Sequence, residues 1–202
     1  MDKLEYEKSC QEKGYKYICG IDEVGRGPLA GPVVACAVIM NLENLVEGVD
    51  DSKKLSAKKR ESLYDQILSK AVSVSIREVD HLEIDRVNIL NATKSCMLSC
   101  VQTLSVKPDV LLIDAVKLDT DIDQVSIIKG DAKSYSIACA SILAKVYRDR
   151  LMAQADQEYP QYGFKNNAGY GTKAHINAIK EFGPCKIHRR TFIKNFWDEQ
   201  AK

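Results

Sequence analysis

Two adjacent carboxylates, Asp22 and Glu23, stand at the end of an apolar run over 17–21. Buried carboxylates are costly unless a positive charge compensates them, and a divalent cation is a common compensator. Directly after them comes Gly25-Arg26-Gly27-Pro28, where the backbone can turn sharply and leave its amides uncovered. An arginine held between glycines can reach a phosphate. Together these residues indicate metal-assisted chemistry on a phosphodiester.

Two further acids follow apolar runs later in the chain. Asp114 ends the run over 109–114, and Asp131 comes after the run over 125–128. If the first run and the run over 109–114 are parallel neighbouring strands, Asp22 and Asp114 meet at the edge where open α/β sheets place their sites. Asp131 either joins them or caps the helix that follows it. A single acid of this kind is more often a strand-end cap or a salt-bridge partner, but three of them beside a Gly-Arg-Gly turn favour a shared site.

Carboxylates that converge in one dry pocket cannot all stay ionised unaided. Two Mg²⁺ or Mn²⁺ ions about 4 Å apart would relieve the repulsion and supply the clamp used in phosphoryl transfer. Oxygen ligands with no histidine near these motifs favour such hard cations over zinc. Glu23 carries a difficulty, because neighbouring side chains of a regular strand face opposite ways. Asp22 and Glu23 can share a metal only if the backbone departs from strand geometry there, which Gly25 and Gly27 would permit.

The elements that must position these residues are predicted to alternate between strands and helices. Apolar or alternating runs predict five strands, at 17–22, 33–40, 71–79, 109–114 and 125–128. Predicted helices lie at 1–14, 56–69 with Ser56 as N-cap, 81–105 with a new helix from Asn88, 134–158, 172–182 and from Thr191 onward. The pattern predicts a single α/β domain over 1–202, with a mixed five-stranded sheet flanked by helices and a small C-terminal helical segment.

Seven cysteines, an odd number without the spacing of a disulfide framework, indicate a reducing compartment. The charged N-terminus has no apolar signal region, and no stretch of about 18 apolar residues exists to span a membrane. We therefore expect a cytoplasmic protein. Cys96 and Cys100 lie four apart on a predicted helix, where metal ligation is conceivable. No histidine or second cysteine pair accompanies them, which favours small core residues.

The net charge of +1 conceals an asymmetry along the chain. Residues 160–202 contain eight Lys/Arg and three acids, a net charge of +5. A basic segment on a near-neutral protein could contact a polyanion close to an acidic, metal-binding centre. A solvated, lysine-rich tail explains the same charges equally well. Charge alone does not decide between the two, and we expect residues of about 160–202 to form a substrate-contacting loop followed by C-terminal helices.

The chain resembles ribonuclease HII in an ordered series of motifs that runs from residue 17 to about residue 192. The motifs are Gly20-Ile-Asp-Glu-Val-Gly-Arg-Gly-Pro-Leu-Ala-Gly-Pro32, Asp51-Ser-Lys-Lys-Leu55, Asn88-Ile-Leu90, Leu112-Ile-Asp114, Lys129-Gly-Asp-Ala-Lys-Ser134, Ala138-Cys-Ala-Ser-Ile-Leu-Ala-Lys145, Gly169-Tyr-Gly-Thr172 and His188-Arg-Arg-Thr-Phe192. Ribonuclease HIII shares the core but carries an extra N-terminal domain. Only about 16 residues precede the first predicted strand here, which favours HII.

The resemblance implies a ribonuclease H-like fold and a metal-dependent endonuclease. Its substrates would be RNA in RNA–DNA hybrids and single ribonucleotides in duplex DNA, cut on the 5′ side to leave 3′-hydroxyl and 5′-phosphate ends. Such an enzyme removes ribonucleotides and RNA primers from DNA. The catalytic residues and Mg²⁺ or Mn²⁺ ligands would be Asp22, Glu23, Asp114 and Asp131. We expect a monomer whose partners are these two kinds of duplex.

By the same resemblance, Gly25, Arg26, Gly27 and Tyr170 read the ribose 2′-hydroxyl, the group that distinguishes RNA from DNA. Backbone groups bared at the glycines can hydrogen-bond this hydroxyl. Tyr170 can pack its ring on the next sugar and offer its own hydroxyl. On the residues alone, Tyr170 is equally well explained as a packed loop tyrosine. A polar pocket of this kind strongly rejects a ligand that lacks the hydroxyl.

Ser52, Lys53 and Ser134 are the expected contacts to backbone phosphates. A lone lysine such as Lys53 is more often a solvated surface residue. Further candidates for the path of the duplex are His175, His188, Arg189 and Arg190. His188 could equally be a structural histidine, and it receives no catalytic role.

Two competing functions stay open on the sequence. Another metal-dependent nuclease or phosphotransferase of the same fold, such as a resolvase or integrase core, would need the acids but not the Gly-Arg-Gly turn and Tyr170. A non-catalytic binder of hybrid duplexes belongs to a different class. The carboxylates argue against such a binder, because they repel phosphate and would weaken binding.

Overall fold

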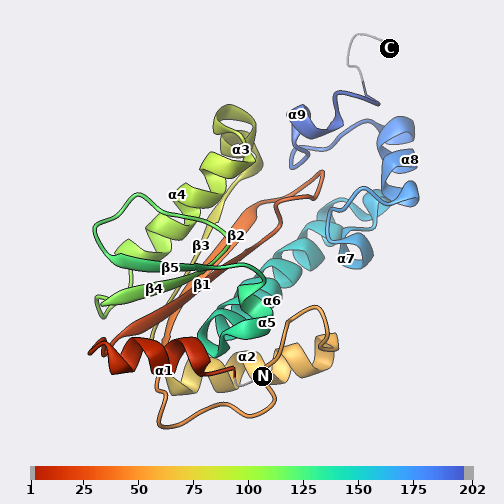
Figure 1. Cartoon of the computed structure of the whole chain (residues 1–202). Coiled ribbons are helices and arrows are strands. Elements are labelled where there is room, and N and C mark those ends of the chain that lie inside the picture. Colours follow the sequence, from red (N-terminus) through yellow and green to blue (C-terminus); the bar gives the residue numbers. More distant parts are fainter. Residues whose placement is uncertain (1–2, 198–202) are drawn as a thin grey trace.

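A five-stranded sheet with the order β3-β2-β1-β4-β5 forms the centre of the computed structural model, which describes residues 3–197 (Figure 1). The strands are β1 (Ile18–Val24), β2 (Val33–Met40), β3 (Ala71–Val79), β4 (Val110–Asp114) and β5 (Asp123–Ile127). β1 pairs antiparallel with β2 and parallel with β4, so the sheet is mixed as predicted. The β1–β4 pairing aligns Ile21 with Ile113, and the acids that follow them emerge at the same edge.

Helices cover both faces of the sheet (Figure 1). They are α1 (Glu5–Glu12), α2 (Ala57–Lys70), α3 (His81–Val87), α4 (Ile89–Gln102), α5 (Gly130–Lys133), α6 (Tyr135–Glu158), α7 (Phe164–Asn167), α8 (Lys173–Phe182) and α9 (Arg190–Ile193), with a 3₁₀ turn at Pro160–Tyr162. The expected N-cap at Ser56 is confirmed, because its side chain accepts from Lys59 N. The longer helix expected from Asn88 is α4, and the side chain of Asn88 caps it by accepting from Leu90 N.

β2 shows why the two helical layers form. Every residue of this strand is buried, and alternate side chains point to opposite faces. Val34, Cys36 and Val38 join the core made with α2 and α6. Ala35 and Ala37 join the core made with α4, to which the fully buried thiols of Cys96 and Cys100 also belong. These two cysteines are therefore small core residues, as expected.

The N-terminus of α6 lies very close to β1. A side chain at Gly20 would collide with the backbone of Ser136, so glycine is required for this approach. Glu7 of α1 adds a second tie, because its Oε1 accepts hydrogen bonds from Ser134 Oγ (2.6 Å) and Ser136 N (2.8 Å). The sequence predicts α1 correctly as a helix but not that Glu7 is fully buried. Two N-terminal elements, α1 and β1, thus hold the start of the helix that borders the site.

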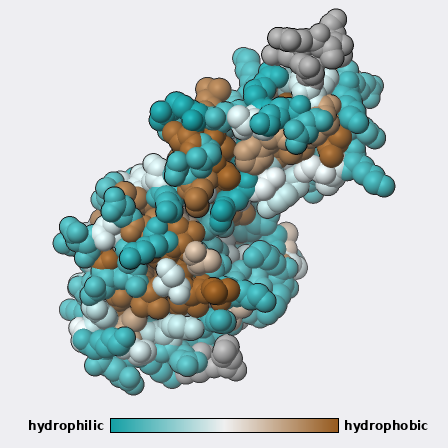
Figure 2. All heavy atoms as spheres, turned by 45° about the horizontal axis from the view of Figure 1, so that its top comes forward, coloured by the Kyte–Doolittle hydropathy of each residue, from teal (hydrophilic) through white to brown (hydrophobic). Residues whose placement is uncertain are grey.

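The elements after α6 project from the sheet-bearing part of the molecule (Figures 1 and 2). They share a small core with the end of α6 and with Ala30 of the β1–β2 connection, and its buried members include Met152, Tyr162, Phe164 and Ile193. The helix expected from Thr191 onward is the short α9, and residues 198–202 of that expectation lie outside the described residues, as do 1–2. Organisation of 1–202 as a single domain stays a prediction.

All seven cysteines carry free thiols, as the sequence indicates. Among residues 3–197, no helix combines the length and the apolar character needed to traverse a bilayer.

Candidate active site

A hollow of about 160 Å³ lies at the sheet edge where the β1–β4 ladder ends. We call it the carboxylate hollow. Its walls come from the ends of β1 and β4, the loop before α2, helix α6 and the loop before α8. The lining residues are Asp22, Glu23, Val24, Ser52, Lys53, Asp114, Ser141, Lys145 and Tyr170. Three of the four predicted metal ligands therefore share one hollow with the predicted ribose-reading tyrosine.

The backbone departure expected at the acid pair does not occur. β1 stays a regular strand, in which Asp22 pairs with Cys36 and Glu23 with Ala35 of β2 without a register shift. The ladder between β1 and β4, however, ends at Ile21. β1 therefore has an open edge at the two acids, and a side chain from either face can reach the same hollow over that edge. An early end of the neighbouring ladder thus replaces the expected distortion of the strand.

Asp22 is almost fully buried and has several hydrogen-bond partners. The Glu23 amide donates to Asp22 Oδ1 at 2.8 Å, and the hydroxyl of Ser141 also bonds to this carboxylate. Ser141 Oγ lies in turn 2.9 Å from Ser52 Oγ. Burial, and next the charge of Glu23, hold the pKa of Asp22 well above its usual range. The cost of ionising Asp22 is therefore high unless a cation enters the hollow.

Glu23 has an unsatisfied oxygen. Burial raises the pKa of Glu23, and the charge of Asp114 adds to this against the opposing charge of Arg26. Arg26 Nη1 lies 3.4 Å from Glu23 Oε1, whereas Oε2 is buried without a hydrogen-bond partner among the described residues. A buried carboxylate oxygen with no partner, beside two further carboxylates, fits a hard divalent cation.

Asp114 and Asp131 stand on either side of the turn that begins α5. The Gly130 amide donates to Asp114 Oδ1 at 3.1 Å, which ties α5 to the end of β4. Asp131 is buried on α5 and does not line the hollow, and its Oδ2 lies 3.1 Å from Lys53 Nζ. The structure thus brings three predicted ligands together and leaves the fourth beside them, neutralised by a lysine. Within residues 3–197, no three His, Cys, Asp or Glu side chains form a ready-made metal-binding group.

The Gly-Arg-Gly turn and Tyr170 are neighbours, as the sequence predicts. Gly25 has φ +93°, and a side chain there would run into Arg148. A Cβ on Gly27 would lie 3.6 Å from the ring of Tyr170, at ordinary contact distance. Tyr170 is 44% exposed and borders the carboxylate hollow. The turn therefore lies close to the ring of Tyr170 at Gly27.

The predicted phosphate contacts have different surroundings. Lys53 lines the hollow with a side chain that is 80% exposed, and Ser52 lies buried beneath it. Ser134 is fully buried as the N-cap of α6, donating to Glu7 and accepting from Ile137 N. Its hydroxyl therefore faces the interior in this structure, because the helix cap and Glu7 use both of its hydrogen-bonding directions.

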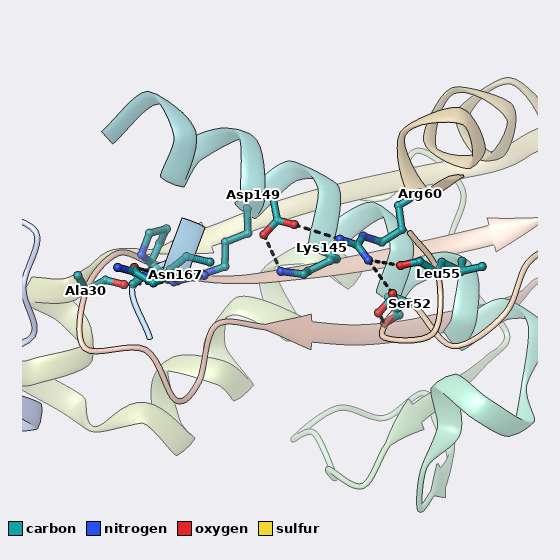
Figure 3. A network of polar contacts seen from close by, with 12 residues as sticks. Ala30, Ser52, Leu55, Arg60, Lys145, Asp149 and Asn167 are labelled. Carbon is teal, nitrogen blue, oxygen red and sulfur yellow. Dashed lines mark hydrogen bonds and ion pairs between the residues drawn. The ribbon is translucent and has the colours of Figure 1, made fainter. Parts of the chain in front are cut away.

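Sequence reasoning gave no role to two α6 residues that line the hollow, Ser141 and Lys145. Figure 3 shows Lys145 and Arg60 on either side of Asp149, with Nζ–Oδ1 at 2.6 Å and Nη2–Oδ2 at 3.7 Å. Arg60 also donates to the carbonyls of Ser52 and Leu55, so this network holds the loop that carries Lys53. Helical spacing of 141, 145 and 148 on one face is the signal that could have revealed them.

The residues expected along the duplex path lie mostly in the interior. His175, His188 and Arg189 have at most 1% of their surface exposed, so they cannot line such a path; Arg190 is exposed. The guanidinium of Arg189 donates to backbone carbonyls of the Gly-Arg-Gly turn. The ring of His175 bonds to the carbonyl of Tyr170 and to the ring of His188. Arg148, also fully buried, donates to the carbonyls of Ala30, Pro32 and Ala168.

A mixed sheet in the order β3-β2-β1-β4-β5, flanked by helices and bearing carboxylates where β1 and β4 end, is a ribonuclease H-like fold. Two solved structures support this class. The ribonuclease H2 of Pyrococcus horikoshii OT3 has a TM-score of 0.76 and 27% identity, and covers 90% of this chain and 97% of its own. The ribonuclease HII of Archaeoglobus fulgidus, solved in a complex with PCNA, has a TM-score of 0.76 and 25% identity at the same coverage.

The family follows from the sequence comparisons. The family model "Ribonuclease HII" matches residues 19–199. A ribonuclease HII of Acetivibrio thermocellus is 57% identical over 192 residues, which cover 95% of this chain and 75% of the relative. One of Caldicellulosiruptor saccharolyticus is 52% identical over 193 residues, covering 95% and 94%. The chain belongs to the ribonuclease HII family and is a type 2 ribonuclease H, an endonuclease of RNA–DNA hybrids, rather than a resolvase, an integrase core or a non-catalytic binder.

Proposed function

We propose that this chain hydrolyses the phosphodiester on the 5′ side of a ribonucleotide, both in RNA–DNA hybrids and at single ribonucleotides embedded in duplex DNA. Products carry 3′-hydroxyl and 5′-phosphate ends. The reaction depends on Mg²⁺ or Mn²⁺, with two ions during catalysis. In the cell this activity removes ribonucleotides and RNA primers from DNA.

One observation carries the proposal. The carboxylates of Asp22, Glu23 and Asp114 share a hollow with Tyr170, which in turn lies against Gly27. Carboxylates suit hard cations, and a tyrosine facing bare backbone suits a sugar. The carboxylates suited to metal-assisted phosphate chemistry therefore lie beside the residues suited to recognising the adjoining ribose.

The four acids Asp22, Glu23, Asp114 and Asp131 would hold the metal ions. When bound, such ions activate water and stabilise the leaving 3′-oxygen. The chain's own residues prepare for this charge: Ser141 and the Glu23 amide fix Asp22, and the Gly130 amide fixes Asp114. The ammonium of Lys53 compensates Asp131 in the protein alone. Because Lys53 is largely exposed on a flexible stem, it can turn to a substrate phosphate.

Ribose recognition falls to Gly25, Arg26, Gly27 and Tyr170. The hydroxyl of a ribose can accept from a loop amide and contact the tyrosine ring, whereas deoxyribose leaves the amide without a partner. A buried donor left unpaired costs about 1–3 kcal/mol, which favours cutting at ribose. Ser52 and Lys53 lie where a phosphate next to that sugar could be held.

Other features support a duplex substrate and a single working chain. Six cations on the C-terminal elements are exposed: Lys165, Lys173, Lys180, Lys186, Arg190 and Lys194. They can attract the phosphates of a duplex that extends beyond the hollow. Both the carboxylates and the ribose-reading residues come from one chain, so a monomer suffices. The free thiols are in keeping with the cytoplasm as its location.

Mapping the products on duplex DNA with one ribonucleotide tests the proposal. With Mg²⁺ and, separately, Mn²⁺, we expect one cut 5′ to the ribonucleotide, with 3′-hydroxyl and 5′-phosphate ends. DNA of the same sequence without the ribonucleotide should stay intact. Ends bearing a 2′,3′-cyclic phosphate, or cleavage that persists in a chelator, would contradict the proposal. Tyr170→Ala should reduce cutting at the single ribonucleotide more than cutting of a continuous hybrid.

A further inference from the structure

Two adjacent buried residues of the C-terminal segment, His188 and Arg189, connect to the ribose-reading groups from the interior of the protein. Arg189 is fully buried, and its guanidinium donates to Gly25 O (2.6 Å), Arg26 O (3.0 Å) and Gly31 O (2.9 and 3.0 Å). No carboxylate among the described residues lies within ion-pair distance of it. Its remaining contact with a favourable charge distribution is the ring of Phe192, whose centroid lies 5.0 Å from Arg189 Cζ. A buried cation without a carboxylate partner is costly, and here carbonyl groups of the Gly-Arg-Gly turn and of Gly31 offset that cost.

The carbonyl contacts determine where the loop amides point. In a trans peptide the C=O of one residue and the N–H of the next point in opposite directions. Because Arg189 holds the carbonyls of Gly25 and Arg26, the N–H groups of Arg26 and Gly27 point away from it. Neither amide has a hydrogen-bond partner in the described part of the chain. Arg189 therefore presents two free donors beside Tyr170.

The preceding residue, His188, acts on Tyr170 through His175. His175 Nδ1 lies 2.8 Å from Tyr170 O, and His175 Nε2 lies 3.0 Å from His188 Nε2. The Cys185 amide donates to His188 Nδ1 at 2.9 Å. Both rings are buried and pack edge-on against Tyr162. A chain of hydrogen bonds thus runs from residue 185 to the backbone of residue 170.

These contacts assign one proton to each ring. Since Cys185 N–H is a donor, His188 Nδ1 accepts, and neutral His188 carries its proton on Nε2. It donates that proton to His175 Nε2, so His175 carries its own proton on Nδ1 and donates to Tyr170 O. A second proton on either ring would set two N–H groups against each other. The chain of hydrogen bonds works only with both histidines neutral and in these tautomers.

We propose that His188 and Arg189 are positioning residues for ribose recognition, in which Arg189 turns two loop amides toward the sugar and His188, through His175, fixes the backbone of Tyr170. This inference rests on the proposed function. It assigns the specificity of the site to residues that never touch the substrate. Two neighbours in the sequence would thereby keep both halves of the ribose-reading pair at a constant separation.

The tautomers can be measured in the wild-type protein without substrate. Nitrogen-15 NMR of the imidazole rings at pH 7 should show His188 protonated on Nε2 and His175 on Nδ1. The side chain of His81, the third histidine, has no hydrogen bond among the described residues, and His81→Gln identifies its signals. The opposite tautomer at His175 would overturn the proposed link to Tyr170.

Two substitutions of His175 separate positioning from packing. Asn places an N–H donor near the position of Nδ1, whereas Gln places its amide near the position of Nε2. We expect His175→Asn to retain the wild-type ratio of kcat/KM between the single-ribonucleotide duplex and the continuous hybrid. His175→Gln should lower this ratio about tenfold, since it loses the bond to Tyr170 O. His81→Gln serves as the control and should leave the ratio unchanged.

Arg189→Lys tests the other half, because lysine keeps the charge but lacks the planar fork that spans three carbonyls. We expect kcat/KM on the single-ribonucleotide duplex to fall about 100-fold. Arg150→Lys, on the surface beside Glu61, is the matched control and should have no effect. Thermal unfolding shows whether each variant is folded. If Arg189→Lys is not folded, the NMR measurement of the tautomers and the variants His175→Asn and His175→Gln test the positioning role.

The outcomes distinguish the proposed function from the positioning role of His188 and Arg189. Failure of the wild-type protein to cut at a single ribonucleotide would overturn the proposed function itself. If the wild type cuts there, but folded His175→Gln and Arg189→Lys keep its substrate preference, the positioning role is overturned and the proposed function stands.

Discussion

Asp22 shows how single residues prepare this site for metal. Its carboxylate is buried beside Glu23 and has neutral hydrogen-bond donors but no cation of its own. Asp131, in contrast, has Lys53, and one oxygen of Glu23 has Arg26. The uncompensated charge is therefore concentrated at Asp22 and the free oxygen of Glu23, which is where a divalent cation would gain most.

Alanine substitutions at two glycines should affect cleavage and stability separately. Gly27→Ala would place a methyl group 3.6 Å from the Tyr170 ring, where the sugar is proposed to lie. We expect stability within about 1 kcal/mol of wild type but cleavage at a single ribonucleotide reduced about 100-fold. Thermal unfolding and cleavage rates measure the two effects.

Gly20→Ala is the counterpart. The new Cβ would collide with the backbone of Ser136, so we expect a loss of more than about 3 kcal/mol in the free energy of unfolding. Full activity of Gly27→Ala would show that no sugar approaches this turn.

At the scale of elements, local patterns predicted more than long-range contacts did. The strands at 33–40 and 71–79 and the helices from Ala57 and Tyr135 follow from apolar periodicity and caps, because these signals lie within the element. β1 and β4 do pair in parallel, which is the condition for their two terminal acids to meet at one edge of the sheet.

Other features depend on partners far away in the sequence. Arg148, Arg189 and Glu7 have the composition of surface residues, yet each is buried against backbone more than 100 residues away. No local pattern identifies such a partner. The same applies to the early end of the β1–β4 ladder, which depends on the length of a separate strand.

The histidine pair between α8 and the C-terminal segment makes stability depend on pH. Burial, and next the charge of His175, lower the pKa of His188 to about 4, and the charges of Arg190 and His81 act in the same direction. Burial also lowers the pKa of His175. The unfolded chain therefore binds more protons than the folded one below about pH 6.5.

We expect stability to fall as the pH drops from about 6.5 towards 4, with a contribution from His188 on the order of 3 kcal/mol. His188→Gln should flatten this part of the dependence, although its stability at pH 7 is lower. Urea unfolding of the wild type and of His188→Gln at pH 7 and pH 5 measures the difference. Parallel pH dependences for wild type and His188→Gln would contradict the assignment of a buried neutral histidine.

On the scale of the whole molecule, the site lies where two parts of the chain meet. The sheet-bearing part supplies the carboxylates, the C-terminal elements supply Tyr170, and α6 runs from one to the other (Figure 1). Exposed cations lie on the C-terminal elements, whereas the acids are gathered in the hollow. This separation lets a duplex bind through its phosphates while one scissile linkage approaches the acids.

The most direct test compares binding and cleavage by Asp114→Asn with those of the wild type. Asn keeps an oxygen for the Gly130 amide, so the turn into α5 should be preserved. On duplex DNA with one ribonucleotide and Mg²⁺, we predict that cleavage falls roughly 1000-fold, while affinity for the duplex stays close to wild type. Asp121→Asn, an exposed acid in the same β4–β5 connection, should behave as wild type. Undiminished cleavage by Asp114→Asn would contradict the assignment of these carboxylates to metal-dependent hydrolysis.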